Sequence, residues 1–166
     1  GLRILRMARF GAELGFAIDK ATLSAAKRYV EGLRDISPER IREELDKILL
    51  SDIRYPASIQ QEEDPRARVL CALVTLRDIG ALDVVLPELV LGRGVEQDET
   101  YHAYDVLDHN LAAAAHVRPE LRLRLAALLH DVGKPEAHLK QGNMHGHERI
   151  GAGIAKEILS RLRYPN

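Results

Sequence analysis

The stretch LLHDVGKP, residues 128–135, decides much of the fold. Its two leucines continue an apolar helical pattern that starts near residue 120, and the glycine and proline that follow predict where that helix stops. His130 and Asp131 would therefore lie at the carboxy end of a helix, where the negative end of the helix dipole favours a cation. The stretch predicts a helical structure with a candidate metal site at one helix end.

The rest of the chain is also patterned for helices. Apolar residues recur at spacings of three and four, aromatic residues make up only 4% of the 166 residues, and strand-like alternation is scarce. We therefore predict an all-α fold. Capping residues, prolines and glycines place the expected helices at about 2–14, 19–34, 38–50, 65–79, 104–116, 120–131 and 147–162, with a loop at 51–63.

Helix-breaking residues divide the chain into two parts. Pro87, Gly92 and Gly94 follow one another shortly before residue 100. We expect a boundary near residue 95, which gives a first segment of residues 1–95 and a second of residues 96–166.

Composition excludes several classes of protein. The 24 basic and 25 acidic residues give a formal charge of −1, so any contact with a polyanion needs a local patch. No apolar run approaches the roughly 20 residues of a membrane span. Cys71 is the single cysteine, which rules out an internal disulfide, and its apolar neighbours predict a buried thiol. We expect a cytoplasmic protein without a membrane partner, and nothing in the sequence indicates its oligomeric state.

The histidines gather in the second segment. All of them follow residue 100, at positions 102, 109, 116, 130, 138, 145 and 147. If the chain turns near residues 117–118, His109 lies nine residues before the turn and His130 twelve after it, so the two come within about 5 Å in height on antiparallel helices. His116 and His138 are expected at the surface. An isolated His-Asp pair usually forms only a hydrogen bond at a helix end. The hypothesis of a metal site therefore depends on the pair together with the spacing to His109 and the glycine and proline that follow.

The candidate ligands indicate a class of metal. Two imidazoles and one carboxylate suit a divalent transition metal (Mn, Ni, Co, Fe or Zn) better than Mg. His109, His130 and Asp131 form the expected set, and His147 leads into the last expected helix nearby. Lys134 is either a cation that orients a phosphate or a lysine that complements the helix dipole.

Three arginines recur at the start of the chain. Arg3, Arg6 and Arg9 stand three residues apart and so fan across roughly 120° of a helix surface. We predict a local basic patch that binds nucleotide or RNA. The alternative is an ordinary solvated helix face.

The second segment resembles the HD superfamily of metal-dependent phosphohydrolases. The resemblance lies in His109, in the adjacent pair His130-Asp131 and in the later His147. It implies metal ligands at these four positions, and catalytic roles for His130, Asp131 and Lys134. The superfamily's last ligand is an aspartate on a later helix, and no acidic residue follows Glu157 here. We therefore expect a truncated HD domain that binds metal weakly.

The first segment resembles the neck and body of bacterial tRNA nucleotidyltransferases (CCA-adding enzymes) and poly(A) polymerases. The resemblance lies in LRILRMARF at 2–10, LGF at 14–16 and ISPERI at 36–41. It implies RNA- and nucleotide-facing helices over residues 1–95, with Arg3 reading the base of a nucleotide. The expected partners are a nucleotide and the 3′ end of a tRNA or another RNA. The sequence lacks the Gly-Ser and Asp-x-Asp motifs of the family's polymerase head, to which Mg²⁺ binding is confined.

The predicted function combines both resemblances. We expect a carboxy-terminal fragment of such a protein, with an RNA-binding region and an HD domain that hydrolyses nucleotide phosphate esters, for example 2′,3′-cyclic phosphodiesters, with metal-activated water. The alternatives are a free-standing HD nucleotidase and a non-catalytic RNA-binding module. The sequence fits CCA addition and poly(A) addition equally well.

Overall fold

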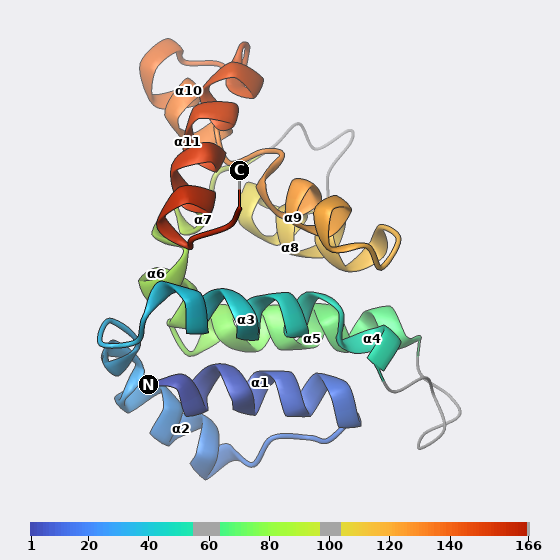
Figure 1. The fold of residues 1–166 in the computed structure, drawn as a ribbon. Helices are drawn as coiled ribbons and strands as arrows, with labels where there is room; N and C mark the ends of the chain where they lie inside the picture. The colour runs from blue at the N-terminus through green and yellow to red at the C-terminus, as the bar shows by residue number, and fades with distance from the viewer. Residues whose placement is uncertain (55–63, 97–103, 166) are drawn as a thin grey trace.

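The structure is a computed structural model that describes residues 1–54, 64–96 and 104–165, in which every regular element is a helix (Figure 1). The predicted all-α class is confirmed. The elements are α1 (Leu2–Leu14), α2 (Lys20–Arg28), the 3₁₀ helix η1 (Val30–Leu33), α3 (Pro38–Leu49), α4 (Ser51–Arg54), α5 (Pro65–Asp78), α6 (Ala81–Val85), α7 (Pro87–Val90), α8 (Val106–His116), α9 (Leu121–Leu129), α10 (Lys134–Gln141) and α11 (His147–Arg161).

The first segment is built in layers. Helix α1 packs against both α3 and α5 (Figure 1). Its buried face includes Leu5, Ala8 and Ala12, which recur at spacings of three and four. The helix ends at Gly15, which adopts the left-handed conformation with φ 67°, as its sequence predicts.

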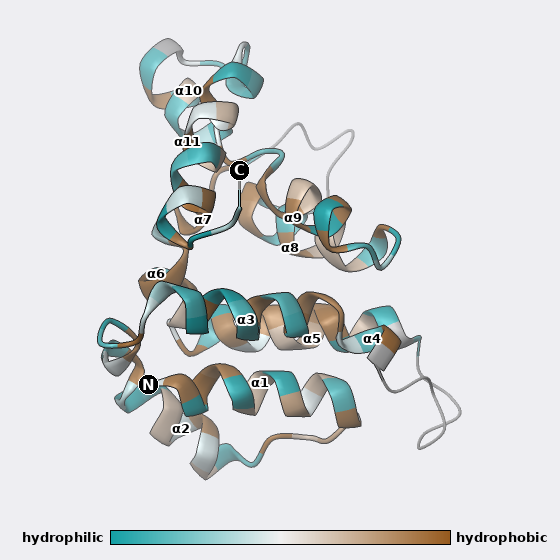
Figure 2. Cartoon of the chain, in the orientation of Figure 1, coloured by the Kyte–Doolittle hydropathy of each residue, from teal (hydrophilic) through white to brown (hydrophobic). Residues whose placement is uncertain are grey.

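The second segment packs on the first through α5. Helix α5 lies between α1 and α8, and its mostly hydrophobic colour in Figure 2 fits a helix that is covered on more than one side. Helices α8 and α9 form the predicted antiparallel hairpin, while α10 packs with α11. One hydrophobic core runs from Leu5 through Leu73 and Leu111 to Ile158, so it crosses the expected boundary near residue 95. None of the helices in the described ranges has the length and apolar character needed to cross a membrane.

Four expectations need correction. The second helix ends at Arg28 and gives way to η1, which contains Gly32, a residue that disfavours a continued α-helix. Residues 51–54 form α4 where a loop was expected. The Gly-Lys-Pro sequence begins α10 as well as ending α9, because Pro135 occupies an early helical position where no amide donor is needed. Cys71, expected to be buried, is exposed.

A buried ion pair links the two segments. The Arg124 side chain is fully buried, and its two terminal nitrogens donate to the Asp52 carboxylate at 2.8 and 2.6 Å. Its guanidinium also donates to the backbone carbonyls of Leu49, Ala115 and Val117. Arg124 thus joins α9 and the α8–α9 turn to the end of α3 and to α4.

This pair generates a stability prediction. Asp52→Ala leaves the Arg124 charge buried without its carboxylate, and we expect the free energy of unfolding to fall by about 3 to 5 kcal/mol. Urea denaturation measures the change. Glu31→Ala is the control, because it breaks the exposed Arg34–Glu31 pair, and it should cost less than about 1 kcal/mol. If both variants lost the same free energy of unfolding, the buried pair would contribute no more to stability than the exposed one, which would contradict the prediction.

Candidate metal centre

Helix ends bring the candidate ligands together. His109 lies in the second turn of α8, and His130 and Asp131 directly follow α9. His147 is the first residue of α11. Because α8 and α9 run antiparallel side by side, the chain turn at residues 117–120 places His109 level with His130, as the residue count predicts.

Three ligand atoms form a small triangle. His109 Nε2 lies 3.2 Å from His130 Nε2 and 3.8 Å from Asp131 Oδ2, while His130 Nε2 lies 3.2 Å from the same oxygen. Atoms bound to one ion at about 2.0 to 2.2 Å stand about 2.8 to 3.6 Å apart in octahedral or tetrahedral sites, so two edges of the triangle fit and the 3.8 Å edge would have to shorten slightly. Among the described residues, His109, His130 and Asp131 form a group that could hold a metal ion.

Backbone carbonyls orient two of the imidazoles. His130 Nδ1 lies 2.7 Å from the Ala127 carbonyl oxygen, and His147 Nδ1 lies 2.8 Å from that of Met144. A neutral imidazole that donates from Nδ1 keeps its lone pair on Nε2, the atom that faces Asp131 in both residues. In the neutral rings these hydrogen bonds favour the tautomer with its lone pair on Nε2, whereas a hydrogen bond from His130 to Asp131 requires the His130 ring to be protonated on Nε2.

Asp131 is the centre of the cluster. Its side chain is 6% exposed, with Lys134 Nζ 2.6 Å from Oδ2 and His147 Nε2 3.3 Å from Oδ1. Burial alone would raise the pKa of Asp131, but the hydrogen bonds from His130 and Lys134 outweigh it and hold this pKa well below its usual range. The hydrogen bond between His130 and Asp131 in turn raises the pKa of His130. The carboxylate therefore stays charged.

Two glycines let α11 approach this cluster. A Cβ atom on Gly133 would lie 2.2 Å from the His147 carbonyl oxygen and 2.5 Å from the Gly151 nitrogen, so only glycine fits. Gly151 lies across this contact, where a Cβ atom would stand 3.3 Å from the Gly133 nitrogen. The sequence indicated only a helix stop at Gly133, and its second role, close contact with α11, was missed because that needs the tertiary arrangement.

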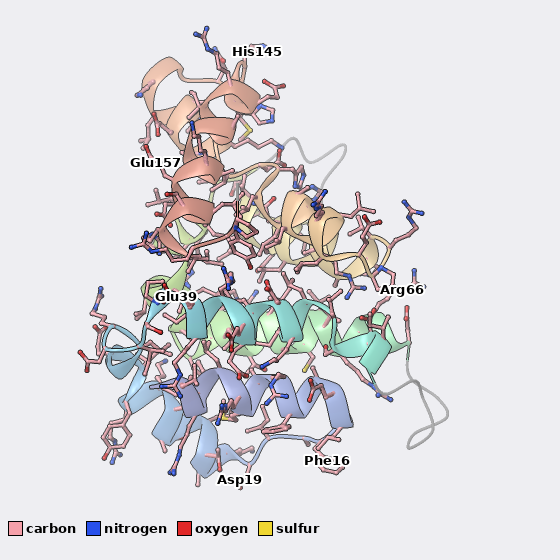
Figure 3. All side chains as sticks on the ribbon, viewed as in Figure 1. Phe16, Asp19, Glu39, Arg66, His145 and Glu157 are labelled. Carbon is pink, nitrogen blue, oxygen red and sulfur yellow. The ribbon has the colours of Figure 1, made fainter. Side chains whose placement is uncertain are left out.

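The remaining predicted residues have varied outcomes. Lys134 is the first residue of α10, five residues beyond the end of α9, and its ammonium is paired with Asp131, so both of its expected roles stay predictions. His116 and His138 are exposed, as expected, and His102 lies outside the described residues. Figure 3 shows His145 at the outer tip of the molecule, where it is exposed. The catalytic and ligand roles themselves stay predictions.

The arginines of α1 do not form one exposed patch. Arg3 is exposed and the Arg6 side chain is half-exposed, but Arg9 is buried, with its guanidinium 2.9 Å from Glu13 and 2.8 Å from Glu44. Residues three apart drift by about 60° per step around a helix, so Arg9 ends about 120° from Arg3 and faces α3. The prediction of an open patch is therefore wrong for Arg9.

Comparisons with known proteins agree with this architecture. Residues 15–57 match a family described as the probable RNA and SrmB-binding site of polymerase A, and residues 100–164 match the HD domain. An A-adding tRNA nucleotidyltransferase of Deinococcus radiodurans is 34% identical over 179 aligned residues, and a CC-adding tRNA nucleotidyltransferase of Thermus thermophilus is 37% identical over the same length. Over nearly its whole length, the chain is similar to part of these tRNA nucleotidyltransferases.

The alignments cover nearly the whole chain but less than half of each relative. Each of these two alignments takes in 99% of the chain and 38% of the relative. A multifunctional CCA protein of Vibrio parahaemolyticus is 36% identical, with 99% of the chain and 39% of that protein covered. The chain thus spans well under half the length of the relatives it matches and corresponds to a carboxy-terminal part of them, as predicted.

The triangle generates a binding prediction. We expect the chain to bind one Co²⁺ or Zn²⁺ weakly, and Asp131→Asn to lower the affinity by at least about 10-fold, because it removes the only anionic ligand of the three. The affinity should also fall as the pH drops through the raised pKa of His130, since a proton competes with the metal for Nε2. Isothermal titration with each ion measures both effects.

The control is His116→Ala. This exposed imidazole bonds to the Ala112 carbonyl of its own helix, and its loss should leave the affinity unchanged. Unaltered binding by Asp131→Asn would show that the metal sits elsewhere.

Proposed function

We propose that the chain combines an RNA-binding segment, residues 1–95, with an HD phosphohydrolase domain, residues 96–166. The observation that carries the proposal is the triangle of His109, His130 and Asp131 inside the region that matches the HD domain. The substrates are phosphate esters of nucleotides, such as 2′,3′-cyclic phosphodiesters. The partner is the 3′ end of a tRNA or another RNA, supported by the match over residues 15–57 and by the printed names of the relatives.

Each residue of the cluster has a distinct task. His109 and His130 would hold the ion through Nε2, and Asp131 would hold it through Oδ2. A divalent transition metal supplies Lewis-acid activation of water for attack on phosphorus. Lys134, as the ammonium beside Asp131, can turn toward a phosphate oxygen and offset its charge. His147 faces the second oxygen of Asp131, on the side where a phosphate or a second ion would lie.

One observation favours a second candidate. The Lys134 ammonium already lies 2.6 Å from the Asp131 oxygen that belongs to the triangle. A cation in this position can neutralise the carboxylate in place of a metal, which would leave a non-catalytic RNA-binding module. The other alternative, a free-standing nucleotidase, gains no support from a chain whose first segment matches an RNA-binding family.

Hydrolysis separates these candidates. With Mn²⁺, Co²⁺ or Ni²⁺ added, we expect the chain to convert 2′,3′-cyclic AMP to a nucleoside monophosphate, which chromatography detects. His109→Ala and Asp131→Asn should each lower the rate at least about 100-fold, because each removes one of three ligands, while His116→Ala should keep the parental rate. A metal-loaded chain without any turnover would favour the non-catalytic module.

Nucleotide addition should be absent from this chain. We expect no incorporation of labelled ATP or CTP at an RNA 3′ end, because the sequence contains neither Gly-Ser nor Asp-x-Asp, and phosphoryl transfer by two Mg²⁺ ions needs such carboxylates. Denaturing gel electrophoresis with a tRNA that lacks its last nucleotide is the measurement. Extension of that tRNA by the purified chain would refute this expectation.

A further inference from the structure

A buried arginine of α5 has no counter-ion. Three arginines are buried among the described residues, and two of them, Arg9 and Arg124, are held by carboxylates at 2.6 to 2.9 Å. Arg68 is the exception: it keeps only 7% of its surface exposed, and its Nε and Nη2 atoms have no hydrogen-bond partner in the described part of the chain. Because a buried charge without a counter-ion is destabilising, Arg68 needs an explanation that packing does not supply.

Arg68 lines a cavity between α1, α2 and α5. The cavity has a volume of about 890 Å³, which lies in the size range of sites for small molecules. The space is open because α1 contributes only small residues to the lining, at spacings of three and four: Ala8, Gly11, Ala12 and Gly15. Phe16, which follows the end of α1 (Figure 3), lines the cavity together with Ile18 and Leu23 and makes that side apolar.

The polar part of the lining comes mainly from one side of α5. Arg68, Cys71 and Thr75 stand three and four residues apart, so they share a face of the helix. The Thr75 hydroxyl donates to the Cys71 carbonyl oxygen at 2.8 Å. Asp64 also lines the cavity, but its carboxylate accepts hydrogen bonds from the backbone and the side chain of Arg66. Arg68 is therefore the group that an anion in this cavity would meet.

We propose that this cavity binds a small organic acid, with one carboxylate on a short, branched apolar body. Nε and Nη2 of Arg68 form one edge of its planar guanidinium, an edge that pairs with both oxygens of a carboxylate through parallel N–H···O bonds. Protein atoms cover this edge, but no ion pair with a described residue fixes it, so a rotation of the side chain can present it to the cavity. This site goes beyond the proposed function, since neither RNA binding nor hydrolysis uses it.

Charge and lining favour a carboxylate over a free phosphate. Arg68 supplies one positive charge, which a single carboxylate neutralises. Inorganic phosphate carries up to two negative charges near pH 7, and its additional oxygens would find few donors in a mostly apolar lining, which costs free energy. A branched apolar body gains free energy instead, because it fills space beside Ala, Gly, Ile and Leu side chains.

Cys71 provides a direct readout of occupancy. It is the single cysteine of the chain, it is exposed, and it lines the cavity, so a bound ligand shields it from alkylation by iodoacetamide. The probe is 4-methylvalerate, for which we expect a Kd of about 1 mM given its small size. At about ten times this concentration the rate of alkylation should fall about 10-fold, which mass spectrometry of the intact chain measures.

Two further probes separate the charge from the apolar body. The uncharged 4-methylvaleramide has nearly the same shape but lacks the carboxylate, and inorganic phosphate has the charge but lacks the apolar body. We expect that neither protects Cys71 at the concentration at which 4-methylvalerate does. This comparison uses the parent chain and needs no substitution.

A pair of variants tests Arg68 itself. Arg68→Met replaces the charge with an apolar side chain, so it should abolish protection by 4-methylvalerate and melt at no lower temperature than the parent. Arg34→Met is the matched control, because Arg34 is exposed, is paired with Glu31 and lies outside the lining. It should keep the parental protection.

Each contrary outcome overturns a stated part of the inference. Absence of protection by 4-methylvalerate, or full protection in Arg68→Met, would show that Arg68 does not form an anion site. Equal protection by the acid and the amide would leave an apolar cavity without charge recognition, and stronger protection by phosphate would overturn the assigned ligand class. Alkylation of Cys71 requires neither RNA nor a metal, so these results leave the proposed function to its own tests.

Discussion

The second segment depends on one buried carboxylate. Asp131 contacts Lys134, His130 and His147, which come from the start of α10, the end of α9 and the start of α11. A charge with 6% side-chain exposure needs compensation, which here comes from an ammonium and from imidazoles. The same requirement gathers the end of α9 and the starts of α10 and α11 around one point, beside His109 of α8. The side chains that compensate the carboxylate thereby form a group that could hold a metal ion.

Rigid packing keeps those segments in place. Arg124 lies six residues before His130. It joins α9 to α4 through its ion pair with Asp52 and to the end of α3 through the Leu49 carbonyl. On the opposite side, Gly133 lets the backbone of α11 approach the turn after α9. Asp52 lies within residues 15–57, which match the RNA-binding family, so this ion pair attaches α9, the helix that precedes His130 and Asp131, directly to that region.

The sequence-based predictions that the structure confirmed depend on short stretches of neighbouring residues. Gly15, the cap at Asp19 and the turn between α8 and α9 were predictable because each depends on a few neighbouring residues. The meeting of His109 with His130 followed from counting residues on a hairpin. The inward turn of Arg9 was missed, because it depends on Glu44 of another helix. The pairing of Lys134 with Asp131 and the exposure of Cys71 likewise depend on packing that one sequence does not reveal.

A crystal of the chain grown with Co²⁺ tests the central claim most directly, because anomalous scattering locates the ion without any assumption about activity. The account predicts one peak about 2.0 to 2.2 Å from Nε2 of His109, Nε2 of His130 and Oδ2 of Asp131, with the Lys134 ammonium moved away from that oxygen. A peak at another place, or no peak with Lys134 still paired to Asp131, would contradict it. In that case the cluster would be a neutralised structural carboxylate and not a metal centre.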